Sequence, residues 1–182
     1  MAYAIDLFCG AGGCSEGLIQ AGFEILFSSD ISPMVQKTYM HRHEQLGLIQ
    51  GENTWFECAD IRNLTGEQIW RHIRELKCFN DGQHTPPKDI DLIIGGPSCQ
   101  GFSRAGRRNI NDPRNMLFRE YVRVISEIKP KYIVLEIASS NIISVTSKKE
   151  LPASCCSADS ALIYPMYSPL IVLFLPASYL HI

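Results

Sequence analysis

A lone cysteine, Cys99, lies in a segment of glycine, proline and polar residues, Gly95–Ser103, directly after the short apolar segment Asp91–Ile94. A thiol becomes a nucleophile when it is accessible and when positive charge nearby lowers its pKa. A single cysteine is more often a small buried apolar residue. The exposed loop expected here, at the end of a predicted strand, favours the nucleophile.

Positive charge follows this cysteine along the chain. Six arginines lie between Cys99 and Arg123 inclusive, against the two acids Asp112 and Glu120, so the local formal charge is +4. The alternative is an ordinary solvated face, but arginines clustered beside a candidate nucleophile suit contacts with nucleic-acid phosphates. We therefore expect DNA contacts from the first three of them, Arg104, Arg107 and Arg108.

A second candidate site starts at the glycine-rich turn Gly10–Gly13, between a predicted strand and a predicted helix. Small residues let a ligand approach the backbone, and a helix N-terminus favours an anionic group. The turn lacks the third glycine of the dinucleotide-binding pattern, and many such turns are glycine-rich for packing alone. Asp30, twenty residues after Gly10, stands where an acid accepts hydrogen bonds from ribose hydroxyls. The turn and the acid together predict a nucleoside cofactor.

Two further acids end predicted strands. Asp60 follows the short strand Phe56–Ala59 and is placed to accept an adenine amino group, although a helix-capping or solvated acid is equally consistent with this position. Glu136 ends the otherwise apolar strand Tyr132–Glu136. In a parallel sheet Glu136 reaches the edge that holds Cys99, which favours a functional role.

Short apolar runs alternate with segments of helical periodicity, which predicts an α/β fold with a doubly wound, mostly parallel sheet. The expected strands are Tyr3–Phe8, Glu24–Ser29, Phe56–Ala59, Asp91–Ile94 and Tyr132–Glu136. The expected helices are Ser15–Ala21, Pro33–His43, Thr65–Lys77 and Arg114–Ile128. The carboxyl ends of parallel strands share one edge, so the candidate residues should gather there.

The composition is that of an ordinary globular domain, with 182 residues of which 46% are apolar and 20% charged. The net charge of −2 gives no overall sign of a nucleic-acid binder, so that reading depends on the local arginines. The seven cysteines are odd in number and show no zinc spacing, and no signal peptide precedes them. A reduced protein of the cytoplasm, or of the nucleus in a eukaryote, is the simplest expectation.

Two motifs resemble, in order and spacing, those of cytosine-5 DNA methyltransferases. Asp6–Gly13 is similar to the family's cofactor-binding motif, and Gly95–Ser103 to its catalytic-cysteine motif. Asp112–Phe118 resembles the segment after the catalytic loop, and Val134–Glu136 the start of the glutamate motif. The resemblance implies a Rossmann-like fold and methyl transfer from S-adenosylmethionine to carbon 5 of a cytosine flipped out of DNA.

The same resemblance implies roles for individual residues. Cys99 is the implied nucleophile and Glu136 the implied partner of the cytosine ring. Asp30 is implied to bind the ribose. The remaining implied cofactor contacts are Phe8 near the adenine, Gly10, Ala11, Gly12 and Gly13 at the methionine part, Ile31 and Asp60 at the adenine, and Ile61, Pro97 and Leu117 around them.

The sequence departs from the family pattern at Ser98, where the family has proline, and at Ile137-Ala138, where it has Asn-Val. No later family motif follows. We therefore divide the chain into a cofactor-binding and catalytic portion, 1–138, and a low-charge tail, 139–182, expected to be irregular. The longest apolar run of that tail, Leu170–Leu175, is too short for a membrane span, so no membrane association is expected.

Two other readings remain. One is an inactive methyltransferase remnant that binds cofactor or DNA weakly; a second polypeptide that supplies the region that reads DNA is compatible with the main reading. An unrelated nicotinamide-dependent oxidoreductase with a redox cysteine is less consistent with the sequence, because the third glycine and a resolving cysteine are absent.

Overall fold

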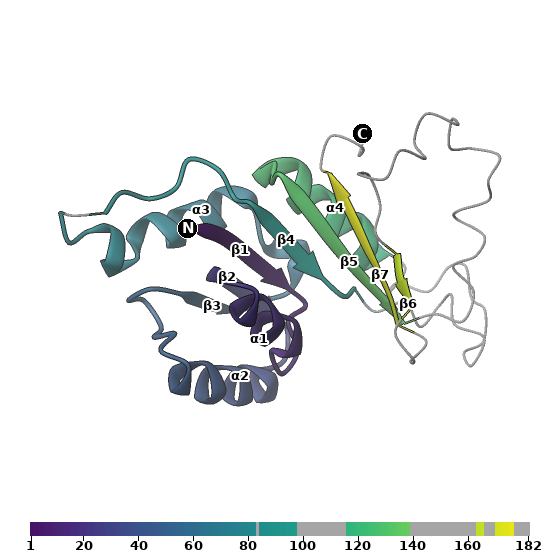
Figure 1. The fold of residues 1–182 in the computed structure, drawn as a ribbon, viewed down its shortest axis with the longest axis horizontal. Helices are drawn as coiled ribbons and strands as arrows, with labels where there is room; N and C mark the ends of the chain where they lie inside the picture. The colour runs from purple at the N-terminus through teal and green to yellow at the C-terminus, as the bar shows by residue number, and fades with distance from the viewer. Residues whose placement is uncertain (83, 98–115, 139–162, 166–169, 177–182) are drawn as a thin grey trace.

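One sheet organises the part of the chain that the computed structural model describes, residues 1–82, 84–97, 116–138, 163–165 and 170–176 (Figure 1). Its strand order is β3-β2-β1-β4-β5-β7-β6. The first five strands in this order pair in parallel. They are β1 (Ala2–Leu7), β2 (Phe23–Asp30), β3 (Trp55–Cys58), β4 (Leu92–Gly95) and β5 (Tyr132–Ala138). The predicted α/β fold with a mostly parallel sheet is confirmed.

The helices begin where the sequence offers a cap. α2 (Pro33–Gln45) starts with proline, and the hydroxyl of Ser32 accepts a hydrogen bond from the Val35 amide. α3 (Gly66–Glu75) starts at a capping box in which Thr65 and Gln68 each bond the other's backbone amide. The other helices are α1 (Gly13–Gln20), α4 (Met116–Ile128) and the 3-10 turns η1 (Ile61–Asn63) and η2 (Lys77–Phe79).

The helices cover both faces of the sheet, as a doubly wound fold requires. Ile5 and Leu7 of β1 point into a large apolar cluster built with α3 and α4. Ala4, next to Ile5 in the strand, points the opposite way and joins a smaller cluster on the other face. Leu18 and Ile19 of α1 cover that second cluster. The two faces are therefore packed independently, and β1 lies between them (Figure 1).

Two strands fall in the region that the sequence predicted to be irregular. β7 (Leu170–Pro176) runs antiparallel to β5, from Tyr132 opposite Pro176 to Ala138 opposite Leu170. β6 (Ile163–Pro165) pairs antiparallel with β7. The expectation of an irregular tail is thus wrong for these two ranges. The apolar run in β7 forms a strand because it pairs with the edge of β5. The sequence of the run alone does not reveal this partner.

Candidate functional site

The carboxyl ends of four strands form a row of paired residues. Leu7 of β1 lies opposite Ser29 of β2 on one side and Gly95 of β4 on the other, and Gly95 lies opposite Leu135 of β5. The predicted site residues follow these positions in the chain. Because the row is continuous, the glycine turn, Asp30, Pro97 and the backbone of Glu136 come to the same edge of the sheet.

Part of the predicted catalytic site lies outside the described residues. This applies to Cys99 and to the three arginines Arg104, Arg107 and Arg108. For Glu136 the structure describes the backbone, which pairs with Val172 of β7, and not the side chain. The catalytic assignment therefore stays a prediction, supported by the position of β4 beside β1 and of β5 beside β4.

The turn after β1 has an unusual backbone that Asp30 holds in place. Phe8 has a φ of 59°, a value that residues other than glycine rarely adopt. Gly10 and Gly12 have φ values of 53° and 93°. One carboxylate oxygen of Asp30 accepts the Gly10 amide at 3.1 Å. The other oxygen accepts the Ser32 amide at 2.9 Å. A single carboxylate thus joins the end of β1 to the start of α2.

Open space surrounds part of this turn. A Cβ placed on Gly10 or Gly13 would meet no atom within 4 Å. The N-cap of α1 is Gly12, which has no side chain to satisfy the first amides of the helix. An open edge at a helix N-terminus without a side-chain cap suits an anionic group such as the carboxylate of a methionine moiety. These residues fit the cofactor that the sequence implies.

The apolar residues predicted to contact the cofactor differ in availability. Ile31, just beyond Asp30, is 64% exposed, which leaves its side chain free to pack against a ring. Phe8 is half-buried, with its ring centroid 6.3 Å from that of Tyr121. Leu117 is half-buried against the same core, and Pro97 is buried. Ile61 is 5% exposed and belongs to the core between the sheet, α3 and α4, so only its backbone is available to a ligand.

Asp60 is engaged by its neighbour. It caps η1 by accepting the Arg62 amide at 3.0 Å, and the Arg62 guanidinium bonds both carboxylate oxygens. The hydrogen bonds from Arg62 hold the pKa of this carboxyl below its usual range. An adenine amino group would have to share an oxygen with Arg62. Of the two alternatives open for this residue, the structure shows the helix-capping one, and the adenine contact stays a prediction.

The four cysteines within the described residues are free thiols. Burial raises the pKa of Cys9, which is 6% exposed, and also that of Cys78. A thiol that keeps its proton is a poor nucleophile. Cys9 and Cys78 therefore offer no alternative to Cys99.

Sequence reasoning missed a buried polar network beneath the turn. The Ser15 hydroxyl donates to Asp6 at 2.6 Å, and the Tyr39 hydroxyl lies 2.8 Å from Ser15 and 2.7 Å from Ser28. Stacking of His43 on Tyr39 completes the cluster. The spacing of four residues between Tyr39 and His43 puts both rings on one helix face, a signal that the sequence does contain.

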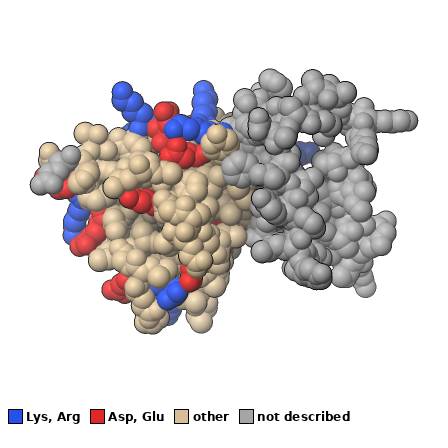
Figure 2. All heavy atoms as spheres, viewed as in Figure 1, with Lys and Arg blue, Asp and Glu red and all other residues tan. Residues whose placement is uncertain are grey.

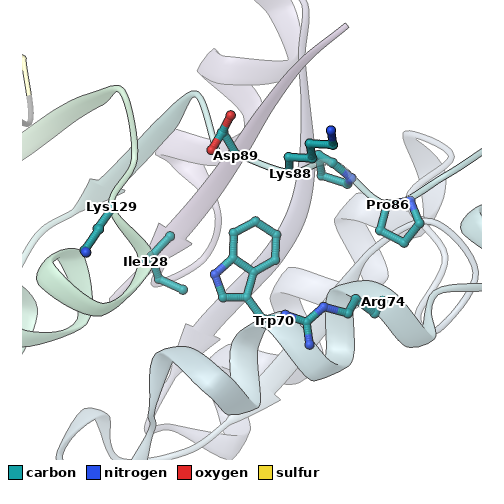
Figure 3. A pocket seen from close by; sticks show the side chains of 8 residues that line it. Trp70, Arg74, Pro86, Lys88, Asp89, Ile128 and Lys129 are labelled. Carbon is teal, nitrogen blue, oxygen red and sulfur yellow. The ribbon is translucent and has the colours of Figure 1, made fainter.

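A second hollow lies at the other end of the strands and differs in character. It is an open groove of about 530 Å³ between Trp70, Ile128 and Pro86, before the first residues of β4 and β5. The guanidinium carbon of Arg74 lies 5.8 Å from the centroid of the Trp70 ring. In Figure 3 the ammonium groups of Lys88 and Lys129 point away from the indole. The charged side chains that line the groove do not converge on one point, and we do not assign the groove to the predicted reaction.

Charges on the described surface are mixed. Basic and acidic side chains are interspersed on the face that Figure 2 shows. Several form ion pairs, such as Arg42 with Glu16 and Lys131 with Asp91. No helix among the described residues is long and apolar enough to cross a membrane.

Comparison with known proteins gives one family. Residues 3–152 match the model of C-5 cytosine-specific DNA methylase. The type II methyltransferase M.XorII of Xanthomonas oryzae pv. oryzae is 38% identical over 132 residues, which cover 72% of this chain and 27% of that protein. M1.HphI of Haemophilus parahaemolyticus is 39% identical over 135 residues, 72% of this chain and 31% of that protein. The chain thus spans about a third of the length of these relatives.

Solved structures agree on the fold. A structure from E. coli described as a prophage-encoded DNA modification methyltransferase superimposes with a TM-score of 0.61 at 23% identity. The match covers 98% of this chain and 47% of the other. An rRNA methylase from Streptococcus thermophilus gives a TM-score of 0.51 at 13% identity, over 96% of this chain and 86% of the other.

Proposed function

Because the chain belongs to the C-5 cytosine-specific DNA methylase family, we propose that it binds S-adenosylmethionine at the carboxyl edge of its sheet and supplies the residues that methylate carbon 5 of cytosine in DNA. The observation that carries this proposal is the double hydrogen bond of Asp30 to Gly10 and Ser32. It keeps the turn after β1 open beside the end of β4, from which the chain leads to Cys99.

Each part of the cofactor has a proposed place. The backbone of the turn Gly10–Gly13, at a start of α1 that no side chain caps, takes the methionine carboxylate. Asp30 keeps oxygen lone pairs for the ribose hydroxyls in addition to its two backbone bonds, since an ionised carboxylate accepts about four hydrogen bonds. The exposed side chain of Ile31 packs on the adenine. Phe8, Pro97 and Leu117 line the same side.

The chemistry follows from the residue types. Carbon 5 of cytosine is a weak nucleophile, so the Cys99 thiolate first adds to carbon 6, and electron density shifts to carbon 5. Glu136 donates a hydrogen bond or a proton to ring nitrogen 3, which stabilises the charge that develops. The bound cofactor supplies an electrophilic methyl group. Loss of the proton at carbon 5 then breaks the bond to Cys99 and restores the aromatic ring.

The partner in this proposal is DNA with the target cytosine flipped out of the helix, because a stacked base is out of reach of a thiol in the protein. Arg104, Arg107 and Arg108 contact the phosphates, which makes DNA affinity fall steeply with added salt. A reaction on DNA places the protein in the cytoplasm, or in the nucleus of a eukaryote. A second polypeptide that reads the DNA sequence fits the same proposal.

A second candidate function is cofactor or DNA binding without methyl transfer. One observation favours it for the chain alone, namely that the chain covers only 27% and 31% of the two relatives named above. We expect the isolated chain to bind cofactor and to transfer little or no methyl.

The test is transfer of labelled methyl from S-adenosylmethionine to mixed-sequence DNA by the purified chain, with Cys99→Ser as the control. Transfer that Cys99→Ser abolishes would show that this chain suffices for the reaction. Cofactor binding without transfer would support the second candidate. A chain that binds neither cofactor nor DNA and transfers no methyl would contradict both.

A further inference from the structure

The glycine turn rests on α2 as well as on Asp30. Gly12 is buried, and a Cβ added to it would lie 2.2 Å from Cε1 of His43 and 3.0 Å from the ring of Tyr39. Those two side chains are 1% and 2% exposed. Their rings stack with centroids 3.8 Å apart and planes 7° from parallel. A flat pair of rings on one face of α2 therefore sets how closely the turn approaches that helix.

The hydroxyl groups beside these rings form a chain with a fixed direction. The Ser15 hydroxyl donates its only proton to Asp6, so in its contact with Tyr39 the tyrosine must donate. Because the Tyr39 hydroxyl donates its only proton to Ser15, it can only accept from Ser28, and the Ser28 hydroxyl must donate to Tyr39. Burial raises the pKa of Tyr39, which agrees with a hydroxyl that keeps its proton. The order Ser28, Tyr39, Ser15, Asp6 links β2, α2, α1 and β1.

The surroundings of His43 favour its neutral form. Its Nδ1 lies 2.8 Å from the carbonyl oxygen of Tyr39, and a carbonyl only accepts, so Nδ1 carries the proton. Burial lowers the pKa of the imidazole. Its Nε2 is buried and has no hydrogen-bond partner in the part of the chain that the structure describes. Since its second nitrogen forms no bond, His43 acts on the turn through the shape and stacking of its ring.

We propose that Tyr39 and His43 are positioning residues that set the glycine turn and the first turn of α1 for the methionine part of the cofactor. This inference rests on the proposed function and deepens it. Two contacts of the pair fall on that part of the site, Gly12 being the N-cap of α1 and Ser15 lying in its first turn. The carboxylate of Asp30, proposed for the ribose, makes its hydrogen bonds to the backbone of Gly10 and Ser32 instead.

The position of the pair predicts an effect on one part of the ligand only. Adenosine contains the ribose and adenine but no methionine part, so it probes the part of the site around Asp30 and Ile31. Tyr39→Phe removes the hydroxyl that orders Ser15 and keeps the stacked ring. We expect this variant to bind S-adenosylmethionine about tenfold more weakly, the size of one lost hydrogen bond, and to bind adenosine as before.

The experiment is calorimetric titration of each ligand into the unaltered chain, Tyr39→Phe and Ile73→Val, well below their melting temperatures. Ile73→Val trims a fully buried side chain on the opposite face of the sheet and controls for a general loss of stability. Equal weakening of both ligands, or unchanged affinity for both, would overturn the positioning role alone. An unaltered chain that binds neither ligand would overturn the proposed cofactor site and this inference with it.

Discussion

Asp30 and Asp60 end or follow neighbouring strands of one sheet, yet their carboxylates are used differently. Asp30 binds the backbone of Gly10, twenty residues away, and that of Ser32. Among the described residues, the carboxylate of Asp60 binds only Arg62, two residues along the chain, through backbone and side chain. The first acid connects two strand–helix units, whereas the second caps its own 3-10 turn. Equal positions in the topology thus do not give equal roles, because the partner of each carboxylate decides whether it shapes the site.

The largest expected effect concerns the turn that Asp30 holds. Gly12→Ala should destabilise the fold by about 3 kcal/mol, because a positive φ costs about 1–2 kcal/mol and overpacking against His43 about 1–3 kcal/mol. Gly22→Ala is the matched control, since Gly22 has a φ of 87° and open space around it. Gly22→Ala should lower the free energy of unfolding by the backbone contribution alone, about 1–2 kcal/mol. Urea unfolding measures both, and equal costs would show that α2 does not constrain the turn.

A direct comparison of the two acids gives the next effect. Asp30→Ala removes the acceptor of two backbone amides and should cost about 2 kcal/mol, the range for hydrogen bonds to a partly buried charged group. Asp60→Ala loses a local cap and an ion pair whose arginine is 61% exposed, and should cost about 1 kcal/mol or less. The same unfolding experiment measures both variants. A larger loss for Asp60→Ala would reverse the comparison.

The smallest effect is the pH dependence of the Asp60 ion pair. Arg62 lowers the pKa of Asp60 in the folded chain, so the pair adds stability above the unfolded-state pKa of about 3.9 and loses it as the pH falls through the lower folded value. The difference in free energy of unfolding between the unaltered chain and Asp60→Asn should be constant from about pH 7 to 5 and shrink as the pH falls below the unfolded-state pKa of about 3.9. A difference that persists in acid would point to packing instead of charge.

Much of the fold follows from the sequence because the parallel strands are apolar and the helices carry caps. Pro33 and Thr65 mark helix starts within one residue of those observed. The antiparallel strand β7 was missed, since its partner β5 is distant in the chain and the run between Pro169 and Pro176 has no alternation to indicate a strand.

The candidate site was predictable in its outline and not in its supports. The glycines stand out because few other residues tolerate such a turn. Asp30 stands out because it is an acid at the end of a strand. Gly12 was assigned to the cofactor, whereas the structure gives it a packing reason against His43. Tyr39 and Ser15 look like ordinary helical residues until the fold brings Asp6 and Ser28 to them. Contacts between elements of this kind depend on tertiary distances that no local pattern encodes.

The central claim is that the carboxyl edge beside Asp30 binds S-adenosylmethionine. The most direct measurement is an NMR titration of the isotope-labelled chain, which follows each backbone amide as cofactor is added. We predict that the amides of Gly10, Gly13 and Ile31 shift, while those of Trp70 and Lys88 in the groove at the other end of the strands stay unchanged. Shifts confined to that groove, or no shift at any amide with cofactor in large excess, would contradict the account.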